Sequence, residues 1–125
     1  MGAYINVGNQ AFAEVLNSEY IDKSGLIAEI NATLRTERRC SCVSRCRRFG
    51  KSMAANMLVA YYDESCDSRE LFRGLEIERH PSFEEHLNKY PVIYVDMTAF
   101  ITQYGHDDGI VKLIQEDIIK DVLKA

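Results

Sequence analysis

The chain has no tryptophan, only two prolines and no apolar run long enough to cross a bilayer. A transmembrane helix needs about 20 consecutive apolar residues, and no basic start followed by an apolar signal segment opens the sequence. We therefore expect a cytoplasmic protein without a membrane partner. With 46% apolar and 27% charged residues among 125, the composition is typical of one globular domain rather than of a disordered chain.

The four cysteines lack the Cys-x-x-Cys spacing that is typical of zinc knuckles. They are Cys40, Cys42, Cys46 and Cys66. Because a reducing cytosol keeps isolated thiols free, we expect neither a metal cluster nor disulfides. The three histidines are also far apart in the sequence, so they form no local signature for nucleophilic catalysis.

Positive charge is scarce except in one segment. The net charge is -4, yet seven of the fifteen basic residues lie between positions 35 and 51. These are Arg35, Arg38, Arg39, Arg45, Arg47, Arg48 and Lys51. The pattern indicates an anionic partner for this segment and excludes a protein that coats nucleic acid over its whole surface.

Apolar residues recur at helical spacing in several stretches, which predicts helices there. The clearest runs from Leu26 to Leu34 behind the capping candidates Asp22 and Ser24, and another begins at or just after Lys51. Further helices are predicted around residues 12–16, from the capping box at 82–85 through 87, and from 109 onward.

Two short segments predict strands. Residues 38–44 alternate weakly, whereas 92–96, Val-Ile-Tyr-Val-Asp, are rich in β-branched and aromatic side chains. Alternating helices and strands are typical of an α/β fold with a parallel sheet. Since two strands are few for such a layer, we expect an incomplete sheet.

The segment 44–52, Ser-Arg-Cys-Arg-Arg-Phe-Gly-Lys-Ser, carries the second half of a phosphate-binding loop. In such loops backbone N–H groups and a helix N-terminus face the phosphates, the lysine reaches them, and the serine binds magnesium. Gly50, Lys51 and Ser52 fit this pattern, but Arg45 replaces the first glycine. From spacing alone, a solvated basic turn stays an open alternative.

Four strings in order resemble the AAA-ATPase-like domain family of bacterial proteins. In that family an arginine at the first position of the loop is the rule, so Arg45 agrees with it. The strings are Tyr-Ile-Asp-Lys-Ser at 20–24, the loop at 44–52, Leu-Phe-x-Gly-Leu at 71–75, and Tyr-Pro-Val-Ile at 90–93 with Asp96. The resemblance implies a P-loop NTPase-like three-layer α/β fold that binds ATP and Mg2+.

The resemblance also implies roles for individual residues. Gly50 would provide the tight turn, Lys51 would contact the β and γ phosphates, and Ser52 would ligate magnesium. The implied cofactor-binding set is Arg45, Arg47, Arg48, Phe49, Gly50, Lys51, Ser52 and Met53. Cys46 departs from the family, which usually has proline there and thereby fixes the backbone.

Asp96 is the second metal candidate. It ends a β-rich run, as the magnesium-holding aspartate of a Walker B strand does. The family carries that acidic strand well downstream, however, so the resemblance argues for a strand-end residue near the site. Both interpretations stay open at this point.

Full members of the family run for several hundred residues, so we expect this chain to be an N-terminal piece. Residues 1–19 would be a weakly patterned segment and 20–125 the N-terminal portion of the P-loop domain. Hydrolysis is expected of the full-length family, and whether this chain is an enzyme stays open. Apolar helix faces after Lys51 and after Asp108 would lack a cover, which favours self-association.

One alternative belongs to a different class of function. The chain would then be a non-catalytic remnant or interaction module whose Arg-rich segment 35–51 binds nucleic acid or an acidic partner.

Overall fold

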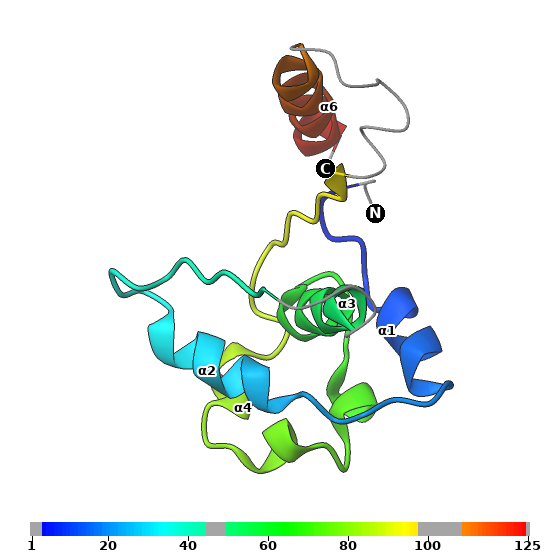
Figure 1. Ribbon diagram of the computed structural model, residues 1–125, viewed down its shortest axis with the longest axis vertical. Coiled ribbons are helices and arrows are strands. Elements are labelled where there is room, and N and C mark those ends of the chain that lie inside the picture. The colour runs from blue at the N-terminus through cyan, green and yellow to red at the C-terminus, as the bar shows by residue number, and fades with distance from the viewer. Residues whose placement is uncertain (1–3, 45–49, 98–108, 125) are drawn as a thin grey trace.

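The computed structural model describes residues 4–44, 50–97 and 109–124. Within these ranges the chain folds into helices and short 3-10 turns, which, α6 excepted, are arranged around one central helix, α3 (Figure 1). In chain order they are α1 (Gln10–Leu16), α2 (Gly25–Thr33), α3 (Lys51–Tyr62), η1 (Arg69–Phe72), η2 (Glu76–Arg79), α4 (Phe83–His86) and α6 (Ile110–Lys124).

The predicted three-layer α/β fold is wrong. In the described ranges the extended segments form no strand and make only isolated bridges, Ile5 with Ile93 and Asp63 with Tyr90. The two predicted strands do not pair with each other. Residues 92–94 bond to residues 4–6 instead, as when the Tyr94 N–H donates to the Tyr4 carbonyl at 2.7 Å.

The physical reason is that a strand forms only when a second extended segment lies beside it and pairs with its backbone. Side chains that suit a pleated surface raise the chance of extended backbone, but a ladder also requires a second segment to supply N–H and C=O partners in register. Residues 39–44 are exposed and lie beside α2, because Ser41 to Ser44 share a pocket with Leu26, Ile30 and Thr33.

The predicted helix positions are confirmed, while the caps predicted at Ser24 and Ser82 are wrong. α3 begins at Lys51, and α1, α2, α4 and α6 lie where apolar spacing placed them. Neither Ser24 nor Ser82 caps its helix with its side chain. The Ser24 hydroxyl accepts the Ile77 N–H at 3.1 Å, and the Ser82 hydroxyl accepts from the Asn31 amide at 3.0 Å. The proposed cap Asp108 lies outside the described residues.

The core surrounds the inner face of α3. Tyr61 and Met57 are fully buried there, and the Tyr61 ring meets Phe72 edge-on at 5.7 Å between centroids. Phe12 from α1 stacks on Phe72 at 5.1 Å. The other buried members of this core are Ile27, Ala60, Ile77, Phe83 and Leu87. α3 is therefore fixed from α1 on one side and from η1, η2 and α4 on the other.

Asn88 fastens the C-terminal end of α3. Its amide donates to the carbonyls of Ala60 at 3.0 Å and Asp63 at 2.7 Å, and its side-chain carbonyl accepts the Ser68 N–H at 2.9 Å. Its backbone has φ of 53°, a left-handed conformation that asparagine adopts more readily than most residues.

α6 lies apart from the other helices (Figure 1). It is tied to the N-terminal segment by Asp121, whose Oδ2 accepts the N–H groups of Tyr4 and Ile5, each at 2.9 Å. Large apolar side chains on α6 are exposed: Val111, Ile119, Val122 and Leu123. Self-association through this face stays a prediction. In the described parts of the chain, no helix is both long and apolar enough to cross a membrane.

We expect Asn88→Gly to lower the free energy of unfolding by about 2 kcal/mol, because buried carbonyls and the Ser68 N–H lose their partner. Asn88→Ala should cost about 1 kcal/mol more, since alanine also resists the left-handed backbone. Urea unfolding of both variants measures the two contributions separately. Wild-type stability in the glycine variant would show that these hydrogen bonds contribute nothing.

Candidate functional site

The N-terminus of α3 begins in a left-handed turn. Gly50 has φ of 82° and ψ of 23°, and its carbonyl accepts the first helical bond, from the Ala54 N–H at 2.9 Å. The N–H groups of Lys51, Ser52 and Met53 precede that bond, so no carbonyl of the helix accepts from them. Together with the helix dipole, these N–H groups make the helix start attractive to an anion.

Lys23 lies against this helix start. A Cβ built on Gly50 would stand 3.1 Å from the Lys23 Nζ. The absence of a side chain at Gly50 therefore leaves room for an ammonium group from a distant part of the sequence. The sequence prediction included Lys23 only as part of the family resemblance and gave it no binding role. A basic residue inside that string was the available signal, but its position relative to Gly50 is a tertiary fact.

Segment 19–24, which carries Lys23, is held by hydrogen bonds to η2. The Asp22 carboxylate accepts the N–H of Ser24 at 2.9 Å and that of Glu76 at 2.8 Å. The buried Ser24 hydroxyl accepts the Ile77 N–H. Partial burial alone would raise the pKa of Asp22, but the hydrogen bonds from Ser24 and the Glu76 N–H outweigh it and lower that pKa below its usual value.

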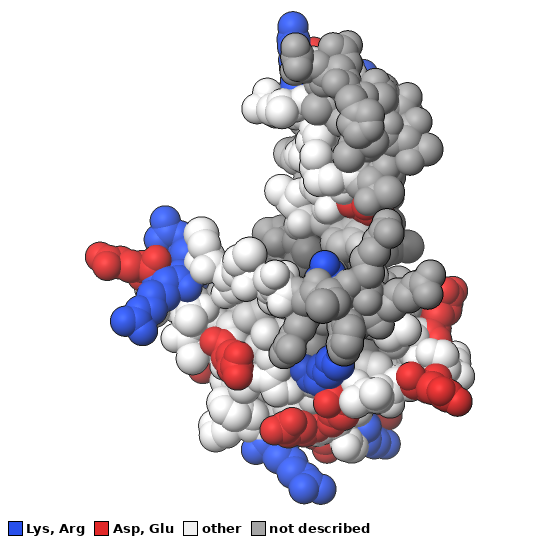
Figure 2. Space-filling view, in the orientation of Figure 1, with Lys and Arg blue, Asp and Glu red and all other residues white. Residues whose placement is uncertain are grey.

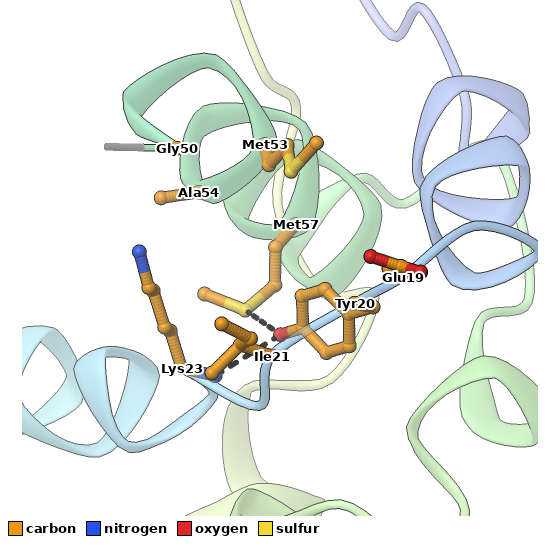
Figure 3. Close-up of a pocket in the computed structure, with 8 residues that line it drawn as sticks. All are labelled: Glu19, Tyr20, Ile21, Lys23, Gly50, Met53, Ala54 and Met57. Atoms are coloured by element: carbon orange, nitrogen blue, oxygen red, sulfur yellow. Dashed lines mark hydrogen bonds between the residues drawn. The ribbon is translucent and has the colours of Figure 1, made fainter. Parts of the chain in front are cut away.

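Tyr20 fixes the other end of the same segment against α3 (Figure 3). Its hydroxyl donates to the Met57 sulfur at 3.4 Å and accepts the Lys23 N–H at 3.3 Å. Its ring meets Phe12 edge-on at 5.7 Å between centroids. Burial raises the pKa of Tyr20, so the phenol stays neutral and able to donate.

Two adjoining pockets border the start of α3 and share Lys23, Gly50 and Ala54. The apolar pocket, about 220 Å³, is drawn in Figure 3 and is lined by Glu19, Tyr20, Ile21, Lys23, Gly50, Met53, Ala54 and Met57. The lysine pocket, about 420 Å³, is lined by Lys23, Leu26, Glu29, Val43, Gly50, Lys51 and Ala54. The apolar pocket is thus lined mainly by apolar side chains, with Glu19 and Lys23 at its border, and the lysine pocket is lined by Lys23, Lys51 and Glu29 beside apolar residues.

Some of the predicted site residues line one or other of these two pockets. Gly50 and Met53 line the apolar pocket, and Lys51 lines the lysine pocket. Ser52 is exposed in the first turn of α3. Four others, Arg45, Arg47, Arg48 and Phe49, lie outside the described residues, as does Cys46.

Asp96 is not among the described lining residues of either pocket. Its segment crosses α3 further along, because Tyr94 shares a pocket with Asn56 and Val59.

The arginines at the start of the basic segment are separated from this site. Arg35, Arg38 and Arg39 follow the C-terminal end of α2, whereas Lys23 precedes its N-terminal end. Figure 2 shows basic and acidic side chains together over the segment that follows α2, at the left of the view. Among the described basic residues of segment 35–51, Arg35, Arg38 and Arg39 thus lie beyond the opposite end of α2 from Lys23.

Three of the four cysteines lie in the described residues, and all three are free thiols. Cys40 and Cys42 are exposed free thiols, and partial burial raises the pKa of Cys66. No group of three or more His, Cys, Asp or Glu side chains with metal-binding geometry occurs in the part of the chain that the structure describes.

A model of the AAA-ATPase-like family, described as predicted AAA-ATPase, matches residues 6–122. The matched range includes α3, segment 19–24 and both pockets. No curated protein and no solved structure matches the chain.

The Asp22 contacts predict a pH-dependent stability difference. A lowered pKa in the folded state contributes stability above the ordinary carboxyl pKa, and this contribution is lost as the pH falls through the folded value. Asp22→Asn should therefore unfold at lower urea concentration than the wild type at pH 7, and the gap should close as the pH falls below about 4.

Glu37→Gln is the matched control, because Glu37 is an exposed carboxylate in the segment after α2. It should unfold like the wild type throughout. A gap for Asp22→Asn that does not change with pH would contradict the role given to the ionised carboxylate.

Proposed function

The chain belongs to the AAA-ATPase-like family of predicted AAA-ATPases, and from this membership we propose that it binds ATP with Mg2+ at the N-terminus of α3. The observation that carries the proposal is the convergence of Lys23 and Lys51 on one pocket beside Gly50. Family membership supports nucleotide binding, and this convergence supplies a location for the phosphates.

The donors of the lysine pocket suit a polyphosphate. Two ammonium groups and the N–H groups of the first turn of α3 attract negative charge, and ammonium–phosphate hydrogen bonds are stronger than neutral ones. Lys51 comes from the helix, whereas Lys23 comes from segment 19–24. A phosphate chain held between them would bridge two elements that already contact each other.

The carboxylate of Glu29 favours binding of the phosphates together with a metal ion. This carboxylate lines the lysine pocket beside Lys23 and Lys51 and would repel a phosphate chain. Magnesium prefers oxygen ligands and lowers this repulsion when it accompanies the nucleotide. We propose Ser52, in the first turn of α3, as the hydroxyl ligand and keep Asp96 as a secondary candidate.

The remaining residues of the variant Walker A segment belong to the same proposal. Arg45, Arg47, Arg48 and Phe49 precede Gly50 in the sequence, and guanidinium groups suit phosphate binding. The proposal concerns binding. It assigns no catalytic base and includes no hydrolysis step.

We expect Lys51→Ala and Lys23→Ala each to weaken binding of a non-hydrolysable ATP analogue by about tenfold or more, since each removes a charge-assisted hydrogen bond. Titration calorimetry with and without magnesium measures this, and the wild-type affinity should fall when magnesium is omitted. Arg38→Ala is the control and should bind within about twofold of the wild type, because Arg38 lies beyond the other end of α2.

The same series tests the polyanion alternative. Equal losses for Lys51→Ala and Arg38→Ala, with affinity that falls steeply with salt and does not depend on magnesium, would indicate a nucleic acid or acidic partner instead. No binding of the analogue by the folded wild-type chain would overturn the proposal.

Two glycines provide a second test. Gly50 and Gly74 both have φ of 82°, but only at Gly50 would an added Cβ meet Lys23; at Gly74 nothing lies within 4 Å. Gly50→Ala and Gly74→Ala should each lower the free energy of unfolding by about 1 kcal/mol through backbone strain. Only Gly50→Ala should also weaken binding of the ATP analogue, because it displaces the Lys23 ammonium. Equal affinities in the two variants would contradict the role of Lys23.

A further inference from the structure

We infer that the apolar pocket beside the lysine pocket holds the purine base of the bound nucleotide. The inference rests on the proposed function and adds the part of the ligand that the phosphate contacts do not explain. Nucleotide sites combine a polar place for the phosphates with an apolar place for the base, and the two must adjoin. Here they share Lys23, Gly50 and Ala54.

The side chains of the apolar pocket suit a flat aromatic ring. Met53 comes from α3 and Ile21 from segment 19–24, and Tyr20 and Met57 form the inner wall (Figure 3). Methionine sulfur is polarizable and contacts aromatic rings favourably, and apolar surface around a base is removed from water when the base enters.

The inner wall of this pocket is held in place by contacts within the protein, before any ligand binds. The Tyr20 hydroxyl is engaged with Met57 and with the Lys23 N–H, and the Tyr20 ring packs on Phe12. Met57 is fully buried. A rigid inner wall lowers the ordering cost of binding, since these side chains are already held in one arrangement.

The outer wall is exposed to solvent. Met53 is 42% exposed and Ile21 is 76% exposed. Both line the same pocket, so a base seated there would cover them together. A purine covers more of this surface than a pyrimidine does because its ring system is larger.

Lys23 connects the two pockets. Its side chain extends from segment 19–24 toward Gly50 and Ala54 in the close-up (Figure 3). A nucleotide with its phosphates beside Lys51 and Lys23 would have its base on the Tyr20 side of Lys23. The base and the phosphates of one nucleotide would thus occupy the apolar pocket and the lysine pocket, which adjoin at Lys23.

The test compares three ligands on the full chain by titration calorimetry with magnesium: non-hydrolysable analogues of ATP and of UTP, and inorganic tripolyphosphate. For the wild type we expect the ATP analogue to bind several-fold more tightly than the UTP analogue, and tripolyphosphate to bind most weakly. Equal affinity for all three would overturn the inference and leave the proposed phosphate site standing. No binding of any of them would overturn the proposed function, and the inference with it.

Met53→Ala removes part of the outer wall without a change of charge. It should weaken the ATP analogue by roughly five- to tenfold through lost apolar contact and leave tripolyphosphate within about twofold of the wild type. Met97→Ala is the matched control, because Met97 is 48% exposed and lines neither pocket. It should bind every ligand like the wild type.

Circular dichroism of both variants shows whether they fold. Equal weakening of ATP analogue and tripolyphosphate in Met53→Ala would overturn the assignment of this pocket to the base. Ile21→Ala repeats the test on an exposed side chain of segment 19–24, and the same selective loss is expected there.

Discussion

The candidate site depends on the hydrogen bonds that join segment 19–24 to η2. Asp22 accepts the Glu76 N–H and Ser24 accepts the Ile77 N–H, so a short extended segment is held in place by the backbone of a neighbouring turn. Lys23 lies between these two residues, so this attachment, together with the Tyr20 contacts, holds it at the start of α3. The ionised form of Asp22 is favoured by the same contacts, so charge and position are linked.

Different parts of α3 contribute to the core and to the candidate site. Its middle and C-terminal part bury Met57, Ala60 and Tyr61, whereas Lys51 to Met53 remain exposed. Asn88 holds the C-terminal end of the helix in place, and this helps to position the N-terminal end as well. Met57 belongs to both regions, because it is a core residue and also the inner wall of the apolar pocket.

The tertiary structure decides which basic residues lie near one another. In the sequence, positions 35–51 form one Arg-rich segment. In the structure, Arg38 follows the C-terminal end of α2, while Lys51 lines one pocket with Lys23, which precedes the N-terminal end of that helix. The candidate site therefore combines Lys51 with a lysine from outside the segment and with Glu29.

By itself the sequence determined the helices and the place of Gly50, Lys51 and Ser52 at a helix start, because apolar spacing and glycine geometry act over a few neighbouring residues. It also carried the strings that resemble the family that the chain belongs to. Only the tertiary structure decided that residues 38–44 and 92–96 do not form a sheet and that Lys23 meets Gly50. Both outcomes depend on which distant backbone groups and side chains become partners, and local propensity does not encode that choice.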